Sequence, residues 1–460
     1  MSADGSPRLT VLPPPPVEAL RESGDPVDMP VGGIRGVFAA LRVANYRYYW
    51  TGQMVSLIGT WMQTVSQPWL VLLLGGTPFQ LGLVLAFQFA PALVLAPISG
   101  VLADRIDKRR AIIFSQVLAM IQAITLFVIT VTGVVEIWHV MVLATLLGTS
   151  HAIEAPFRQS FAAELVPREY LMNAIALNSA SYNFARVIGP AIAGVTLAAF
   201  GPAANFGINS VSSVAVLVGL ARMDPGRINR NDPDVPRASF ARSLGEGVSF
   251  AVRTPFVLWP LVLLTGIATF GMNFQALLPV FARDDLRLDA AGYGALFATM
   301  GIGSLGGSLS LAFLGTRRPI VPLLIGGAVA FVVTEALLGI AVSPWFAFPL
   351  VLLVGFFSMV AVNTINASIQ HAVTHAIRGR VMSLYVLVLS GSTPFGGIFA
   401  GSVAERWGAP VAFIAGAALA ALFVAVVAWN VGVGRLKAVE TVPVVETAPS
   451  APERVERRGA

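Results

Sequence analysis

Three ionisable residues stand at helical spacing in an otherwise apolar stretch of the chain. His151, Glu154 and Arg158 lie at positions i, i+3 and i+7, so on a helix they share one face. Glu154 and Arg158, four residues apart, can form an ion pair, and Arg186 is a second cation that could reach the carboxylate. Charged groups inside hydrocarbon are costly, so such residues normally face a partner or a water-filled cavity.

Three kinds of chemistry are open to these four residues. A carboxylate between two guanidinium groups stays charged, which favours a structural or gating ion pair, or an anion site, over proton carrying. If one arginine is absent or a cationic substrate arrives, Glu154 becomes able to exchange a proton and to act as a coupling residue. His151 can titrate near neutrality, although a single histidine in such a stretch is more often a hydrogen-bonded interior residue.

Neutral polar residues form three further stripes with a spacing of three or four residues. Each stripe would line one face of a helix, where it could bond to a neighbouring helix or face a polar cavity. The stripes are Gln53, Ser56, Thr60, Gln63 and Gln67, then Thr265, Thr269 and Asn273, and finally Asn363, Asn366 and Gln370. The expected substrate cavity is lined by Gln63, Gln67, Thr269, Asn273, Asn363, Asn366 and Gln370.

These polar residues occupy matching places in two halves of the chain. Residues 81–158 run in parallel with residues 293–370, 212 positions further on. In this alignment the charged triplet coincides with the neutral stripe of Asn363, Asn366 and Gln370. Two related bundles with a polar seam at matching depth are typical of secondary transporters.

The composition places these residues in a membrane protein. Of the 460 residues, 56% are hydrophobic and 12% are charged, and the charged fraction is about half that of an average soluble protein. The absence of cysteine excludes disulfides, thiolate metal sites and cysteine catalysis. Twelve apolar segments are each long enough to cross a bilayer as a helix. The predicted spans are residues 48–75, 80–103, 111–133, 138–160, 172–200, 204–222, 256–282, 291–314, 319–342, 346–370, 380–404 and 409–433.

The distribution of basic residues predicts the topology. With both termini in the cytoplasm, the inner segments hold 26 of the 30 Lys and Arg residues, as the positive-inside rule requires. The outer loops hold Arg283, Arg287 and Arg406, and Arg186 lies within a span. The net charge of +6 therefore reflects topology and does not indicate nucleic-acid binding.

We expect an all-α membrane protein with twelve transmembrane helices in two pseudo-symmetric six-helix bundles. The N-terminal tail is rich in proline and lacks the basic-then-apolar order of a secretory signal. Between the bundles, Phe240, Leu244, Val248 and Ala251 have helical spacing, which predicts either a helix along the inner membrane face or a plain linker. The predicted parts are a disordered tail at 1–35, a first bundle at 36–222, a linker at 223–255, a second bundle at 256–433 and a disordered tail at 434–460.

A short motif between the second and third spans resembles the signature loop of the major facilitator superfamily. The matching residues are Gly100, Asp104, Arg105, Arg109 and Arg110. In that superfamily the acidic and basic residues latch the two halves together on the cytoplasmic side, so the resemblance implies a gating role. Asp107 replaces a glycine of the pattern, which puts the expected tight turn in doubt. The other interpretation is a solvated basic loop that only sets topology.

A second motif, in the fifth span, resembles the antiporter motif of the same superfamily. Gly189, Pro190 and Gly194 match it, whereas Ala176 and Ala185 stand where the pattern has glycine. Proline bends a helix and glycine permits close approach of a neighbour, so the motif predicts either a functional bend or structural packing.

Two longer stretches, residues 45–69 and 155–167, are similar to the branch that contains enterobactin-exporter-like and macrolide-efflux-like proteins. The resemblance covers about residues 36–430. It implies alternating access and the export of a small amphiphilic molecule, siderophore-like or drug-like, in exchange for protons. It also implies that the first, fourth, seventh and tenth spans surround the cavity, and it places Glu335, the other buried acid, on a peripheral span.

Other functional classes lack a motif. The chain has no phosphate-binding Gly-x-x-x-x-Gly-Lys-Ser/Thr loop and no hydrolase motif, so we expect neither an ATPase nor an enzyme, and neither a cofactor nor a metal. The expected partners are a small-molecule substrate, protons and the lipid bilayer, for a monomer in the bacterial inner membrane. The main alternative is a facilitator or importer of a small organic solute with the same fold, because alternating access is reversible. A non-transporting receptor would need a folded tail domain, which neither tail indicates.

Overall fold

The computed structural model describes residues 38–102, 106–228, 240–314 and 320–431, and within these ranges the chain forms helices and no strands. The first half contains η1 (Ala39–Arg42), α2 (Ala44–Leu73), α3 (Pro78–Leu102), α4 (Lys108–Val131), α5 (Ile137–Glu164), η2 (Arg168–Tyr170), α6 (Leu171–Ala221) and η3 (Pro225–Arg227). The second half contains α7 (Phe240–Arg253), α8 (Pro255–Gly266), η4 (Ile267–Gly271), α9 (Phe274–Val280), η5 (Phe281–Asp285), α10 (Ala290–Leu314), α11 (Ile320–Gly339), α12 (Pro344–Ala372) and α13 (His375–Val431). Both predicted tails lie outside the described residues.

Nine helical stretches of the described chain are long and apolar enough to cross a membrane. Two of them, α6 and α13, each contain two predicted spans, because Gly201 and Gly408 interrupt the helical dihedrals with φ values of 75° and 87°. Such values favour glycine, and a proline follows each glycine within two residues. The more polar α2 adds a helix of 30 residues. The described helices are therefore consistent with twelve spans.

The seventh predicted span is broken, which the sequence did not predict. It consists of α8, the π-helix η4, α9 and the π-helix η5, and Met272 and Asn273 between η4 and α9 have non-helical dihedrals. The Asn273 side chain donates to the carbonyl oxygens of Thr269 at 2.8 Å and Phe270 at 3.2 Å. These bonds satisfy carbonyls near the wider π turn and so stabilise the break.

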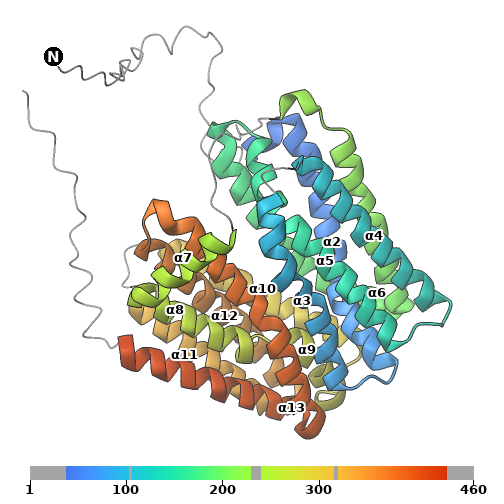
Figure 1. Cartoon of the computed structure of the whole chain (residues 1–460). Coiled ribbons are helices and arrows are strands. Elements are labelled where there is room, and N and C mark those ends of the chain that lie inside the picture. The colour runs from blue at the N-terminus through green and yellow to red at the C-terminus, as the bar shows by residue number, and fades with distance from the viewer. Residues whose placement is uncertain (1–37, 103–105, 229–239, 315–319, 432–460) are drawn as a thin grey trace, which may run out of the picture.

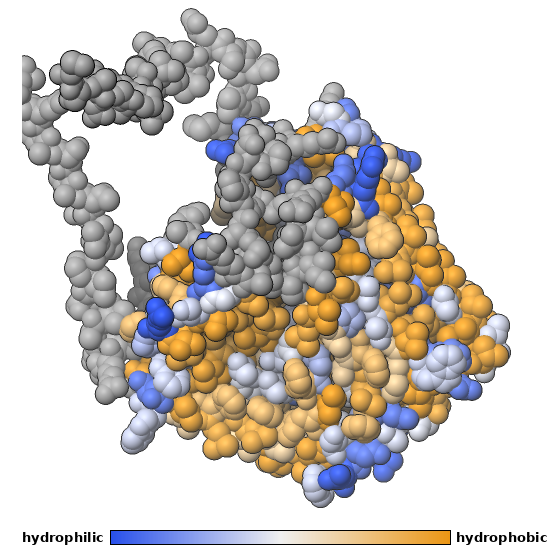
Figure 2. All heavy atoms as spheres, in the orientation of Figure 1, coloured by the Kyte–Doolittle hydropathy of each residue, from blue (hydrophilic) through white to orange (hydrophobic). Residues whose placement is uncertain are grey.

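The helices form two bundles that lie side by side (Figure 1). Helices α2 to α6 pack against one another, and helices α8 to α13 do the same. The bundles meet mainly along two helix pairs, α3 with α13 and α6 with α10. Figure 2 shows hydrophobic residues over most of the flank of the visible face and hydrophilic residues gathered toward its ends. This distribution suits a chain whose sides face lipid and whose ends face water.

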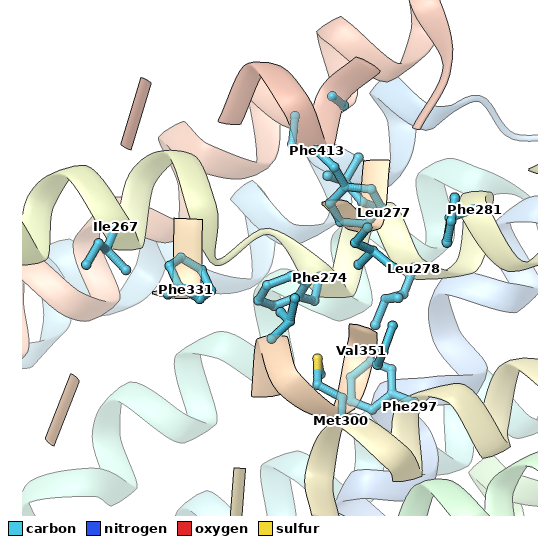
Figure 3. Close-up of a cluster of buried hydrophobic side chains, with 14 of the residues drawn as sticks. Ile267, Phe274, Leu277, Leu278, Phe281, Phe297, Met300, Phe331, Val351 and Phe413 are labelled. Carbon is cyan, nitrogen blue, oxygen red and sulfur yellow. The ribbon is translucent and has the colours of Figure 1, made fainter. Parts of the chain in front are cut away.

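Aromatic side chains of the broken seventh span form the core of the second bundle (Figure 3). The ring of Phe274 on α9 lies 6.3 Å from that of Phe331 on α11 and 6.3 Å from that of Phe413 on α13. Phe281 contacts Phe413 edge to face at 5.5 Å. These contacts hold α9 between α11 and α13 even though its own backbone is interrupted.

The bundles touch backbone to backbone at one end. A Cβ atom added to Gly82 on α3 would overlap the carbonyl group of Gly397 on α13, and one added to Gly194 on α6 would lie 2.8 Å from Cα of Gly294 on α10. Glycine at these positions lets the helices approach closely. Three more contacts join the bundles here: Phe79 N to Glu405 Oε2 at 3.1 Å, Arg283 Nη1 to the Leu72 carbonyl at 3.0 Å, and stacked rings of Trp69 and Tyr293 at 5.2 Å. We call this the sealed end.

At the opposite end the ribbons of the two bundles diverge (Figure 1). Residues of α6 near this end, Met172, Ile175 and Tyr182, have exposed side chains. We call it the open end. Helix α7 lies there and packs on α8 and α13, and its Glu246 pairs with Arg380 of α13 at 2.5 Å. Residues 240–253 are therefore helical, as the apolar spacing allowed, rather than a plain linker.

Candidate functional site

The predicted ion pair of the fourth span is present on α5. Nη1 of Arg158 lies 3.7 Å from Oε1 of Glu154, and Gln116 of α4 donates to Oε2 of Glu154 at 2.8 Å. Glu154 is 4% exposed, so its charge depends on these two neighbours. Both partners belong to the first bundle, so these contacts join helices α4 and α5 within one bundle.

The structure does not bring Arg186 to Glu154. Nη1 of Arg186 lies 3.5 Å from Sδ of Met359 on α12, and its Cζ lies 5.9 Å from the ring centroid of Trp61 on α2. Its Nε has no hydrogen-bond partner among the described residues. The reason is the packing of α6, which runs mainly along α2, α10 and α4 and touches α5 little, although α5 precedes it in sequence. Arg186 therefore faces the second bundle.

His151 is not the hydrogen-bonded interior residue that a single histidine in an apolar stretch suggests. Its side chain is exposed, and no hydrogen bond or ion pair joins it to a described residue. It stands on α5 three residues before Glu154, on the same side of the helix. An exposed imidazole beside a buried ion pair is accessible to water or to a ligand.

Gln63 lies at the centre of a polar network within the first bundle. It donates to Oε1 of Gln122 on α4 at 3.0 Å and to Oε1 of Gln67 at 3.4 Å, and it accepts from Asn209 on α6 at 2.7 Å. Gln63 therefore bonds to neighbouring helices, which is one of the two roles that the polar stripe on the first span allows. The sequence patterns do not single out the polar partners Gln116, Gln122 and Asn209. The signal that could have identified them is an isolated amide side chain within an apolar span.

The same glutamines also reach the second bundle across a small cavity. Gln63 and Gln67 of α2, Gln88 of α3 and Gln275 of α9 line a cavity of about 20 Å³ between the bundles. A space of this size holds about one water molecule. Gln63 and Gln275 are 212 positions apart, the same offset as in the repeat, and the structure places both on this cavity. The cavity lies toward the sealed end.

The predicted cavity residues of the second bundle divide into two groups. Asn273 is buried and bonds to its own backbone, and a Cβ atom on Gly396 of α13 would lie 2.5 Å from its Oδ1, so Asn273 supports the helix break. Thr269 is half-buried beside it. Asn363 donates to Oγ of Ser308 on α10 at 3.2 Å, which ties α12 to α10.

The end of the α12 stripe lies nearer the open end. Gln370 is exposed and donates to Oδ1 of Asn366 at 2.5 Å, one turn earlier on the same helix. Asn366 also hydrogen-bonds to Tyr385 of α13, whereas Gln370 retains hydrogen-bonding groups for water or a ligand. Of the α12 stripe, these two residues fit the predicted cavity role best.

The described part of the signature loop bonds within the first bundle. Arg109 donates from Nε to the carbonyl of Leu220 at 2.9 Å and from Nη2 to that of Ala221 at 3.4 Å, so it caps the C-terminus of α6. Asp107 is the N-cap of α4 and accepts from the backbone N–H of Arg110 at 3.0 Å. The aspartate that replaces the expected glycine thus starts a helix. Asp104 and Arg105 lie outside the described residues, as do the surroundings of Gly100.

A further ion pair strengthens this region. Lys108 at the start of α4 pairs with Glu164 at the end of α5, and both side chains are largely buried. The two helices are therefore joined by an ion pair at the open end of the first bundle. With Arg109 bound to α6, the basic residues at the start of α4 join three helices of one bundle.

The antiporter-like motif provides close packing. Gly189 lies against Trp61 of α2, and Gly194 lies against Gly294 of α10, with the carbonyl of Pro190 also close to Gly294. Within α6 the dihedrals become non-helical at Gly201 and stay helical at Pro190. The packing alternative is therefore what the structure shows.

Glu335 of α11 is a second buried acid, separate from the ionisable set on α5. It is 1% exposed, and its Oε2 makes no hydrogen bond to a described residue. It lies against the broken seventh span, where a Cβ atom on Gly271 would be 3.0 Å from Oε2. Glycine in η4 makes room for the carboxyl group.

Comparison with known proteins identifies relatives along the described length of the chain. Residues 35–459 match a protein-family model described as transmembrane secretion effector. An uncharacterized MFS-type transporter, YfiS of Bacillus subtilis, is 28% identical over 278 residues, which cover 58% of this chain and 62% of YfiS. The staphyloferrin A transporter of Staphylococcus aureus is 26% identical over 375 residues, covering 79% of this chain and 90% of that protein. The enterobactin exporter EntS of Escherichia coli is 25% identical over 343 residues, covering 74% and 80%.

Solved structures with low sequence identity share the fold. A variant of the nucleoside transporter NupG superposes with a TM-score of 0.69 at 12% identity, covering 85% of this chain and 98% of that one. A bacterial homologue of the human lysosomal transporter Spinster, in an inward-facing and unoccupied conformation, superposes with a TM-score of 0.64 at 14% identity, covering 87% and 96%. These matches establish the arrangement of helices in two bundles.

Proposed function

Because the chain belongs to the transmembrane secretion effector family of the major facilitator superfamily, we propose that it is a proton-coupled exporter of a small amphiphilic molecule. The substrate class is siderophore-like or drug-like, in keeping with the names of the staphyloferrin A and enterobactin relatives. Members of this family are multi-pass membrane transporters, and the apolar helices fit that role. The protein works as a monomer in the bacterial inner membrane.

The observation that supports this proposal is the close backbone contact between the bundles at the sealed end, where Gly82 meets Gly397 and Gly194 meets Gly294. With both termini in the cytoplasm, as the arginine distribution favours, the sealed end faces outward and the open end faces the cytoplasm. An exporter loads its substrate in this conformation. Rocking of the bundles would then part the glycine contacts of the sealed end and close the open end, where the signature loop lies.

The charged residues have roles in this cycle. Glu154 and Arg158, which pair on α5, would couple or gate the movement, with His151 exposed beside them. Asp104, Arg105, Arg109 and Arg110 would close the open end as a latch, for which Arg109 must leave the end of α6. The glycines at 189 and 194 would set the distance between α6 and its neighbours.

We expect collapse of the proton gradient to abolish export. In energised inside-out vesicles that contain the protein, uptake of a fluorescent amphiphile should exceed uptake by vesicles without it. A protonophore should reduce the uptake to that background, because no nucleotide-binding motif is present to supply energy. The measurement is the initial rate of fluorescence change.

Two controls separate the alternatives. An ionophore that removes the membrane potential but keeps the pH difference tests whether protons are the coupling ion. Uptake that continues at full rate with the protonophore would contradict proton coupling and support a facilitator. Accumulation in right-side-out vesicles and none in inside-out vesicles would support an importer.

A further inference from the structure

The guanidinium group of Arg186 lacks an acidic partner inside the membrane region. It stands near the middle of the part of α6 that precedes Gly201. Among the described residues it forms no ion pair, and its Nε has no hydrogen bond. Its hydrogen-bond contact within the described part of the chain is with the weak acceptor Sδ of Met359, which lies 3.5 Å from Nη1. A cation at this depth is costly unless an anion or water compensates it.

Aromatic rings surround this cation. Trp61 of α2 presents its ring 5.9 Å from Cζ of Arg186. The ring of Tyr182, one turn earlier on α6, lies 5.8 Å from that of Trp61, edge to face, and its side chain is exposed. Phe297 of α10 is buried behind Trp61, with its ring 6.5 Å from that of Trp61. The cation therefore lies at the edge of an apolar, ring-lined surface.

Both bundles contribute to this surface. Trp61, Tyr182 and Arg186 come from the first bundle, and Met359 comes from the second. The backbones of α6 and α10 also lie close together here, because a Cβ atom on Gly301 of α10 would lie 2.8 Å from the carbonyl oxygen of Arg186. A molecule bound here would touch both bundles and would sense their relative movement.

The acid that could have neutralised Arg186 is already engaged. Glu154 pairs with Arg158 and accepts from Gln116, and all three belong to α4 and α5. Glu335 lies on α11 against η4 and is separate from this surface. The site thus retains a positive charge, which attracts an anionic group and repels a cationic one.

We propose that Arg186 binds the anionic group of the exported molecule, and that this molecule is a small aromatic anion such as a carboxylate or phenolate. The planar guanidinium can hold two oxygens of a carboxylate side by side. The rings of Trp61 and Tyr182 accept the aromatic part, and the flexible Met359 adapts to its shape. The inference rests on the proposed export function and adds the charge and the chemical class of its substrate.

The test measures binding of three matched probes to the purified full-length protein. The probes are 1-naphthoate, the neutral 1-naphthamide and the cationic 1-naphthylmethylammonium, which share one ring system and differ in charge. We expect the naphthoate to bind more tightly than the other two, by calorimetry or by the rise in melting temperature. In Arg186→Gln its affinity should fall about tenfold or more, and Arg186→Lys should retain part of it, since charged hydrogen bonds contribute that much.

Arg406→Gln is the matched control. Arg406 also lies over a tryptophan ring, with Cζ 6.0 Å from Trp407, but it is exposed near the sealed end. This variant should bind naphthoate as the wild type does. Size-exclusion profiles and melting curves without ligand show whether each variant is folded, and Arg186→Lys provides a second folded variant if Arg186→Gln is not.

Several results would overturn the inference. Equal affinity for naphthoate in the wild type and Arg186→Gln would remove Arg186 from the site, and equal binding of the naphthamide would remove the charge requirement. Absence of binding by all three probes would reject the aromatic anion as the ligand class. If Arg186→Gln still exports a neutral amphiphile in a gradient-dependent manner while naphthoate is not a substrate of the wild type, the inference fails and the export function stands.

Discussion

Replacing Arg158 with alanine is expected to destabilise the protein more than any other single loss of charge on α5. The change leaves Glu154, 4% exposed, with Gln116 as its remaining hydrogen-bond partner among the described residues. Breaking a buried ion pair from one side costs about 3–5 kcal/mol. The Arg158 side chain is 39% exposed, so screening by water places the expected loss at the lower end of that range. Thermal or denaturant unfolding in detergent measures it.

A double variant separates the effect of the unpaired Glu154 carboxylate from the effect of the packing lost with the Arg158 side chain. In Glu154→Gln combined with Arg158→Ala no buried carboxylate remains, so the double variant should be more stable than Arg158→Ala alone. Arg168→Ala removes an exposed cation near the same end and should change stability little. If the double variant loses the sum of the two single losses, the pair makes no contribution and this account of α5 is wrong.

Replacing Gly294 with leucine is expected to abolish transport by preventing closure of the sealed end. A Cβ atom at position 294 would lie 2.7 Å from the backbone nitrogen of Gly194 and 2.9 Å from the carbonyl of Pro190. Backbone atoms cannot move aside as a flexible side chain can, so α6 and α10 must separate. The bundles should then favour conformations in which this end is open, and the transport rate should fall to background.

Cysteine labelling reports this opening directly, because the chain has no cysteine of its own. Leu81 is buried at the sealed end, and a cysteine introduced there should react with a water-soluble maleimide faster in Gly294→Leu than in the wild type. Gly326→Leu is the control, since a Cβ atom at that glycine of α11 meets nothing within 4 Å. Normal transport with slow labelling in Gly294→Leu would show that the glycine contact is not part of the seal.

The spans and the ion pair could be predicted from the sequence because both depend on local patterns. Length and apolarity define a membrane helix, and a spacing of four residues is enough to bring Glu154 to Arg158. The break in the seventh span could not be predicted in this way. It depends on Asn273 bonding to its own backbone, which competes with the helix and leaves the hydropathy unchanged.

The direction in which a stripe of polar side chains points is the second feature that the sequence could not predict. Helical spacing shows that Gln63 and Gln67 share a face, but both a neighbouring helix and a cavity satisfy an amide. The structure shows both uses at once, because Gln63 bonds to α4 and α6 and also borders the small cavity. The sequence offers Arg186 as a possible partner of Glu154 because their spans are consecutive, whereas in the structure α6 packs on α2 and α10.

Paired distances across the two ends test the central claim, that the bundles rock about a crevice sealed at one end at a time. Spin labels on cysteines at Phe79 and Arg406 span the sealed end, and labels at Met172 and Ser383 span the open end. All four side chains are exposed. Pulsed electron paramagnetic resonance on the protein in lipid nanodiscs gives both distances as the pH is lowered. We expect a population in which the sealed-end distance lengthens while the open-end distance shortens. Two distances that stay fixed, or that lengthen and shorten together, would contradict the account.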